Sequence, residues 1–164
     1  MAHPQLLEPV TGPYVWKRAD LERDQSWLMN FSENQLEIID SAIRAVEGKQ
    51  VFRFTAQDFP LPGMDAFFED LRVELDRGRC IKLIRGFDVT RYTEEQLYKF
   101  YWGFNLHLGT PMCQNARGEL IGEVRDRGND YTVNNVRGYT TSQGIAFHCD
   151  SGDVVNLLCI HPYN

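Results

Sequence analysis

The spacing of apolar residues changes along this 164-residue chain, and no other feature constrains the fold as strongly. Up to about residue 109, apolar side chains recur every three or four positions, which is typical of amphipathic helices. From Glu119 onward they alternate with a period of two, which indicates strands. Helices followed by antiparallel strands predict an α+β fold, because a parallel sheet would need strands and helices in alternation.

Three helices are predicted, and two of them begin at a capping box. In this motif a serine or threonine and a glutamine three positions later each accept a hydrogen bond from the other's backbone N–H. These pairs are Ser32 with Gln35 and Thr93 with Gln96. The second helix covers residues 67–75. Each pattern stops at a glycine, which favours helix termination: Gly48, Gly78 and Gly109.

Strands are predicted at 51–59, 80–85, 119–125, 139–149 and 153–161, because apolar residues alternate or cluster there between turn signals. Residues 1–30 contain several prolines and predict an irregular arm with one short helix near Leu21–Met29.

Composition excludes several classes of protein. The chain is 43% hydrophobic with a net charge of −6 and has no basic cluster, which disfavours disorder and nucleic-acid binding. It shows neither a signal-peptide pattern nor an apolar run long enough to span a membrane. The four cysteines are widely spaced and form no C-x-x-C pair, so we expect reduced thiols and a cytoplasmic protein.

The sharpest chemical feature is a histidine and an aspartate two positions apart, His148 and Asp150, inside a predicted strand. Side chains at i and i+2 of a strand share one face, so the imidazole and the carboxylate can converge on one metal ion. With a second histidine they would form the facial triad of non-haem iron oxygenases. The motif alone favours a half-exposed pair near a strand end over a metal site. Cys149 would point to the opposite face and be buried.

The surrounding sequence resembles the TauD/TfdA-type family of Fe(II)- and 2-oxoglutarate-dependent oxygenases. The resemblance covers about residues 78–160 and rests on ordered pieces: CIKLIRGFDVTRYTEEQLYKFYWGFNLHLGTP, then GELIGEVRD, then RGYTTSQGIAFHCDSGDVVNLLCI. It lies in a strand ending in R-G, a helix leading into L-G-T-P, an aromatic residue before H-x-D, and an apolar strand after it.

The resemblance implies a fold, a reaction and a set of ligands. The fold would be N-terminal helices followed by the first half of a double-stranded β-helix, or jelly roll, with an arm and helix in residues 1–60 and the incomplete jelly roll in 61–164. His148 and Asp150 match the first two iron ligands. The cofactors would be Fe(II) and the co-substrate 2-oxoglutarate, and the reaction would be the hydroxylation by O₂ of an unidentified small organic molecule. The family's distal histidine and its 2-oxoglutarate-binding arginine are expected beyond Asn164.

Two other histidines are weaker candidates. His161 lies eleven residues after Asp150 along a predicted strand, which at about 3.3 Å per residue places it too far away to share a metal. His107 stands at the C-terminal end of the third helix, where a structural role at the negative end of the helix dipole is expected.

Four residues upstream of the H-x-D motif are candidates for a substrate pocket: Asn134, Asn135, Arg137 and Tyr139. The alternative is a polar loop that leads into a strand.

Two other readings of the whole chain remain open. A truncated or split relative would bind a partner without turnover of its own, and a cupin-like binder would carry more histidines close together than this chain has. Because the last strand would have an open edge, we expect the missing half of the jelly roll to come from the same chain or another one, or a homo-oligomer to form. Residues 1–164 alone are therefore expected not to turn over.

Overall fold

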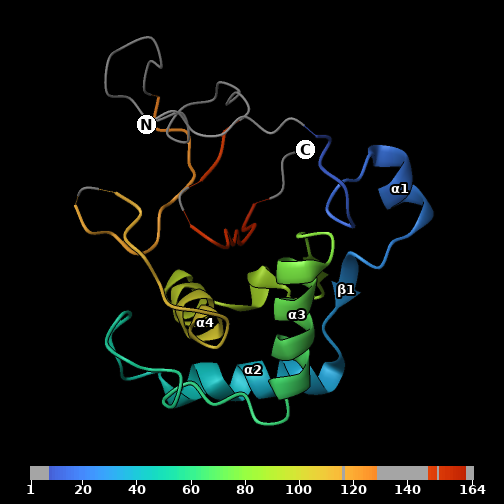
Figure 1. Ribbon diagram of the computed structural model, residues 1–164. Helices are drawn as coiled ribbons and strands as arrows, with labels where there is room; N and C mark the ends of the chain where they lie inside the picture. The colour runs from blue at the N-terminus through green and yellow to red at the C-terminus, as the bar shows by residue number, and fades with distance from the viewer. Residues whose placement is uncertain (1–7, 116, 129–147, 151, 162–164) are drawn as a thin grey trace. The chain divides into compact units, whose positions relative to one another are not determined.

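The computed structural model describes residues 8–115, 117–128, 148–150 and 152–161 (Figure 1). The chain forms two compact units, Met1–Gly109 with Cys159–Asn164, and Thr110–Leu158. The helices and strands of the described residues all lie in the first unit: α1 (Arg18–Arg23), β1 (Leu28–Asn30), α2 (Glu33–Ala45), α3 (Asp65–Arg77), β2 (Leu83–Arg85), the 3₁₀ helix η1 (Val89–Arg91) and α4 (Glu94–Leu106). The domain boundary predicted after residue 60 stays a prediction.

Both predicted capping boxes are confirmed. Before α2, the Gln35 N–H donates to Ser32 Oγ at 3.2 Å, and the Ser32 N–H donates to Gln35 Oε1 at 2.9 Å. Before α4, Thr93 and Gln96 exchange the same two bonds at 3.3 and 2.9 Å. Each box satisfies backbone donors that the first helical turn leaves unpaired, so the local sequence sets where these helices begin.

Helix α4 is the centre of the first unit. In Figure 1, α2 runs beneath α3 and α4, and α2 contacts α4 directly. Phe68 of α3 and Phe104 of α4 pack with ring centroids 4.9 Å apart, and Phe31, after β1, stacks on Phe67 at 5.6 Å. Burying each such ring contributes about 2–3 kcal/mol. Within the described residues, no helix combines the length and the apolar character needed to cross a bilayer.

The two strands form a parallel pair in which Leu28 lies opposite Leu83 and Asn30 opposite Arg85. The strand predicted at 80–85 is therefore confirmed in its last three residues. The helix predicted at 21–29 is wrong in position, because α1 ends at Arg23 and β1 occupies the end of that range. The pairing partner of β1 lies about 55 residues further along the chain, so no local pattern could have indicated it.

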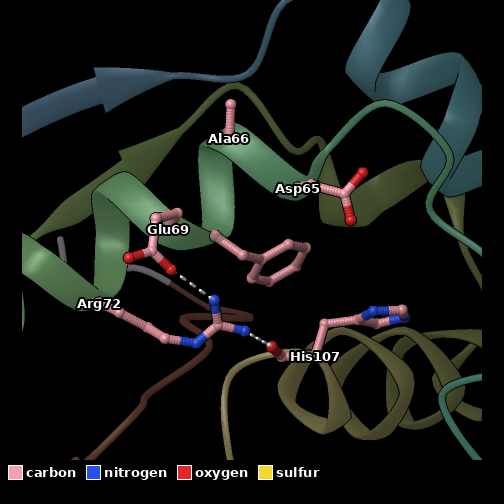
Figure 2. Close-up of a pocket in the computed structure, with 6 residues that line it drawn as sticks. Asp65, Ala66, Glu69, Arg72 and His107 are labelled. Atoms are coloured by element: carbon pink, nitrogen blue, oxygen red, sulfur yellow. Dashed lines mark hydrogen bonds and ion pairs between the residues drawn. The ribbon is translucent and has the colours of Figure 1, made fainter.

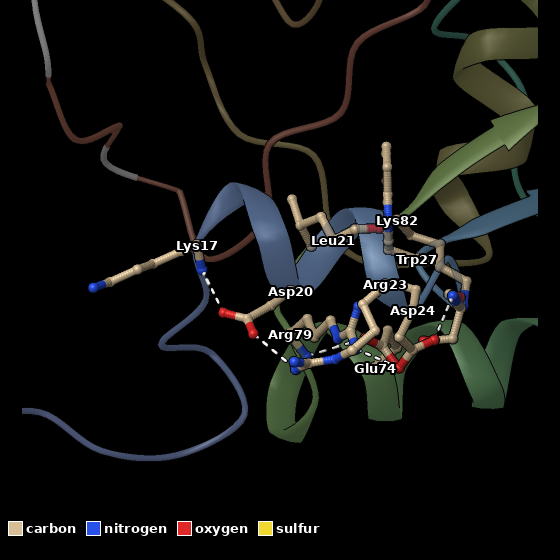
Figure 3. Close-up of polar contacts among 10 residues, drawn as sticks. Lys17, Asp20, Leu21, Arg23, Asp24, Trp27, Glu74, Arg79 and Lys82 are labelled. Carbon is tan, nitrogen blue, oxygen red and sulfur yellow. Dashed lines mark hydrogen bonds and ion pairs between the residues drawn. The ribbon is translucent and has the colours of Figure 1, made fainter.

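Polar contacts fasten the N-terminal segment to the start of β2 (Figure 3). The Arg79 guanidinium donates to the Asp24 carbonyl at 2.7 Å and to the Asp24 carboxylate. The Arg79 carbonyl accepts a bond from Trp16 Nε1 at 3.0 Å. Further along, Lys82 Nζ donates to the Ser26 carbonyl at 2.8 Å. These bonds hold the segment before β1 beside the segment that becomes β2.

Residues 51–59 form turns, so the strand predicted there is wrong. The Asp58 carboxylate accepts bonds from the Thr55 N–H at 2.8 Å and the Thr55 hydroxyl at 2.9 Å, which closes the turn. Phe54 and Phe59 are nevertheless both buried, with ring centroids 6.2 Å apart. The apolar residues of this segment thus reflect burial of two loop side chains, Phe54 and Phe59, and not the alternating faces of a strand.

The strands predicted at 119–125 and 153–161 are not observed in the described residues. The prediction at 139–149 lies mostly outside those residues. A strand exists only through hydrogen bonds to a neighbouring strand, and periodicity alone cannot supply that neighbour. The jelly-roll half remains a prediction.

Candidate metal centre

The H-x-D motif brings its two ionisable side chains close together. His148 Nε2 lies 3.9 Å from Asp150 Oδ1, and the two side chains are 54% and 57% exposed. The approach agrees with the i, i+2 spacing, although residues 148–150 form no strand in the structure. Cys149, between them, is exposed, so the expectation that it is buried was wrong.

The geometry of this pair fits two adjacent ligands of one metal ion after a small adjustment. Two neighbouring ligands of an octahedral ion with bonds of about 2.1 Å lie about 3.0 Å apart. The observed separation of 3.9 Å is about 0.9 Å longer. Closing this difference requires rotation of one or both of these exposed side chains about their χ angles. An imidazole nitrogen and one carboxylate oxygen are also the donor types that the facial triad uses.

A third ligand is not in place among the residues that the structure describes, where no three His, Cys, Asp or Glu side chains gather at one point. His161 is exposed and belongs to the first unit, whereas His148 and Asp150 belong to the second. The four candidate substrate residues, Asn134, Asn135, Arg137 and Tyr139, lie outside the described part of the chain.

His107 has a structural role at the end of α4, as its position predicts. Its Nε2 lies 2.8 Å from the Phe59 carbonyl oxygen, and its ring stacks on Phe68 at 5.4 Å. Since a carbonyl oxygen only accepts hydrogen bonds, Nε2 carries the proton. The His107 carbonyl in turn accepts a bond from Arg72 Nη2 at 2.5 Å. His107 is thereby committed to joining α4 to α3 and to the loop at Phe59.

A cavity of about 370 Å³ lies beside His107, between α3 and the end of α4 (Figure 2). No sequence motif pointed to this cavity. Its polar lining consists of two carboxylates one helical turn apart, Asp65 and Glu69, together with Arg72 and His107. Figure 2 shows the Arg72 guanidinium between Glu69, at 3.3 Å, and the His107 carbonyl. The one sequence feature that could have indicated the cavity is the i, i+3 spacing of Glu69 and Arg72. That spacing is typical of a helix-stabilising ion pair and does not indicate a ligand site.

Ion pairs also order the start of the second unit. The Glu119 carboxylate accepts bonds from Arg117, at 3.1 Å, and from Asn115. The Arg117 guanidinium and the Asn115 amide stabilise the charged form and lower the pKa of Glu119 below its usual range. These exposed contacts shape a turn.

Comparison with known proteins gives one informative similarity. No family model matches the chain. It is 30% identical over 158 residues to FR-33289 synthase of Streptomyces rubellomurinus (strain ATCC 31215), a match that covers 94% of this chain and 47% of the relative. The chain therefore spans about half the length of the curated relative that it matches, and nearly all of it resembles part of an enzyme.

Proposed function

We propose that this chain is part of an Fe(II)- and 2-oxoglutarate-dependent oxygenase that hydroxylates a small organic molecule, with His148 and Asp150 as iron ligands. The observation that carries the proposal is the convergence of His148 Nε2 and Asp150 Oδ1 to 3.9 Å, with both side chains open to solvent. The similarity to a synthase supports an enzymatic role. The sequence around H-x-D resembles the TauD/TfdA-type oxygenases, which supports this particular chemistry.

His148 would bind the metal through Nε2 as a neutral imidazole, and Asp150 would bind through one carboxylate oxygen. The pair thus contributes one negative charge, which leaves a divalent ion able to attract an anionic co-substrate. When bound, the iron supplies the oxidation: O₂ and 2-oxoglutarate are consumed, a C–H bond becomes C–OH, and succinate and CO₂ are released.

Two protein ligands hold a divalent ion far less firmly than three. The proposal therefore requires a third protein ligand, together with a cationic side chain for the far carboxylate of 2-oxoglutarate. We expect both outside residues 1–164, in polypeptide that corresponds to the unmatched half of the relative. The substrate pocket would include Asn134, Asn135, Arg137 and Tyr139.

The test is succinate formation by the protein at its full natural length, with Fe(II), 2-oxoglutarate and O₂. His148→Ala and Asp150→Ala should each abolish it, because each removes a metal ligand. Cys149→Ser is the matched control from the same tripeptide and should retain activity. If Cys149→Ser is as inactive as His148→Ala, the side chains that carry the chemistry have been misidentified.

A second assay uses residues 1–164 by themselves. They should show no sustained turnover, because the proposal places the third ligand and the 2-oxoglutarate cation outside these residues. Sustained turnover by a monomer of this segment would contradict the proposed ligand set and place the third ligand at His161 or His107. No succinate from the full-length protein under any of these conditions would favour the alternative of a binding or structural partner.

A further inference from the structure

The N-terminal segment from Glu8 to Asp24, here called the strap, lies on the surface of the first unit. Asp20 and Leu21 are half-buried, and every other residue of the strap is exposed. Helix α1, which lies within the strap, buries none of its residues. Burial of apolar side chains is the main force that holds the parts of a fold together, and the strap gains little from it. Its polar contacts with residues 25–109, here called the body, therefore matter more.

Arg79 is the residue of the body to which the strap is fastened (Figure 3). Its guanidinium donates to the Asp24 carbonyl at 2.7 Å and to the Asp24 carboxylate. Its carbonyl oxygen accepts a bond from Trp16 Nε1 at 3.0 Å. A single residue of the body thus binds the strap on both sides of α1, with its side chain at one point and its backbone at the other.

Helix α3 holds Arg79 in position. The Arg79 N–H donates to Glu74 Oε1 at 3.0 Å, and the next N–H, that of Cys80, donates to the Glu74 carbonyl at 3.2 Å. Glu74 stands in the last turn of α3, a helix that buries Phe67, Phe68 and Leu71 in the core. Arg79 is therefore anchored by the body independently of the strap.

The chain just after the strap is bound to the body as well. Lys82 Nζ donates to the Ser26 carbonyl at 2.8 Å, and the Leu83 N–H donates to the Trp27 carbonyl at 2.9 Å. Neither bond involves a residue of the strap. If the strap leaves Arg79, these bonds can stay in place, and the chain bends between Asp24 and Ser26.

The bond between strap and body is sensitive to dissolved salt. The Ser26 N–H and the Arg79 guanidinium lower the pKa of Asp24 below its usual range, so this carboxylate is charged at neutral pH. The Asp24 side chain is 51% exposed, and that of Arg79 is 18% exposed. Ions in solution can therefore reach one side of the pair. The distance over which they screen a charge falls from about 30 Å at 10 mM salt to about 3 Å at 1 M.

We propose that the strap opens as one unit while the body stays folded, and that the ion pair of Arg79 with Asp24 sets how often it opens. The strap is thus a conformational device that responds to ionic strength. Opening releases the Arg79 guanidinium and the Trp16 indole. It also unwinds α1, because six residues are too few for a helix to persist by itself in water. The proposal does not involve iron and stands independently of the proposed function.

The three tryptophans of the chain are built-in reporters of this opening. Each indole N–H donates to a backbone carbonyl: Trp16 to Arg79 at 3.0 Å, Trp27 to Leu21 at 3.1 Å, and Trp102 to Phe54 at 3.2 Å. The first two bonds join the strap to the body, whereas the third lies within the body. Opening of the strap breaks the first two and leaves the third.

The test is hydrogen exchange of the three indole N–H groups in the full chain, followed by NMR at 10 mM and at 1 M NaCl. Each rate is divided by that of free tryptophan in the same solution. At 1 M NaCl, exchange of Trp16 and Trp27 should quicken together by at least about threefold, and that of Trp102 should not change. Asp24→Asn should quicken both at least about tenfold at 10 mM NaCl and remove the salt dependence.

Glu22→Gln is the matched control. Glu22 pairs with Arg18 at 2.6 Å, and both residues belong to α1, so this ion pair does not join the strap to the body. The substitution removes the same charge as Asp24→Asn and should alter exchange of Trp16 by less than about twofold.

Each of the other outcomes overturns the proposal. Exchange of Trp16 that is the same at both salt concentrations means that the ion pair does not control opening, a result that needs no variant. Equal quickening of Trp102 means that the body unfolds together with the strap. Quickening of Trp16 without Trp27 means that the strap does not open as a unit. A Glu22→Gln protein that exchanges as fast as Asp24→Asn means that loss of any negative charge suffices.

Discussion

Substitution of Gly103 by alanine tests the packing at the centre of α4. A Cβ atom at this position would lie 2.3 Å from Cγ of Phe59, and 2.5 and 2.7 Å from its two Cδ atoms. Carbon atoms in contact are ordinarily about 3.5–4.0 Å apart, so the ring or the helix must move by more than 1 Å. Phe59 is fully buried, so its ring can move only by displacing its neighbours.

Two effects of opposite sign determine how much Gly103→Ala changes the free energy of unfolding. Alanine favours a helix interior over glycine by about 1 kcal/mol. Overpacking of a filled core costs about 1–3 kcal/mol, and the separation of 2.3 Å places this site at the upper end. We expect Gly103→Ala to lower the free energy of unfolding by about 2 kcal/mol, and the melting temperature by about 4–8 °C. Urea and thermal unfolding followed by circular dichroism measure both.

The matched control is Gly48→Ala, because a Cβ at Gly48 meets nothing within 4 Å. Its stability should change by no more than about 0.5 kcal/mol. In the background of Phe59→Leu, which shortens the obstructing side chain, Gly103→Ala should cost less than it does alone. A Gly103→Ala protein as stable as the parent would refute the reasoning, because it would show that the ring yields freely.

Three further predictions concern stability. Cys80 has a φ of +60°, so Cys80→Gly should relieve a left-handed backbone and raise the free energy of unfolding by up to about 1 kcal/mol in urea titrations. Lys99 is 2% exposed and donates to the Glu47 carbonyl, so Lys99→Met should leave that oxygen unpaired and cost about 1–3 kcal/mol in the same titrations. The Lys49 ammonium and the Thr55 N–H lower the pKa of Asp58 to about 2. Its stabilisation is therefore present above about pH 4 and lost as pH falls toward 2, and Asp58→Asn should flatten the pH dependence of the urea midpoint in that window.

The helices could be predicted because the signals that begin them are local. Ser32 and Gln35, or Thr93 and Gln96, are three positions apart and form their bonds within one turn. The strand β1 could not be predicted, because Leu28 owes its extended conformation to Leu83 far along the chain. The strand predicted at residues 51–59 was wrong for a related reason. Phe54 and Phe59 lie in a loop and are buried, and buried apolar residues alone do not distinguish a loop from a strand.

In the candidate site, too, local relationships could be predicted from the sequence and non-local ones could not. The spacing of His148 and Asp150 made their approach predictable, because two positions apart is a local relationship. Their mutual distance and exposure required coordinates, and so did the role of His107, which depends on the Phe59 carbonyl nearly fifty residues away. A third metal ligand is a non-local relationship, which no spacing within a single motif can identify.

Binding of a metal ion by His148 is the most direct test of the central claim. Mn²⁺, a redox-stable divalent ion, is added to residues 1–164, and the imidazole signals are followed by NMR, since a bound paramagnetic ion broadens the resonances next to it. Mn²⁺ should broaden the His148 ring signals at concentrations that leave His107 sharp, because His107 is engaged with the Phe59 carbonyl. Asp150→Ala should remove this selectivity, and Cys149→Ser should preserve it. Equal broadening of the two histidines, or selective broadening of His148 that persists in Asp150→Ala, would contradict the assignment of His148 and Asp150 as a pair of metal ligands.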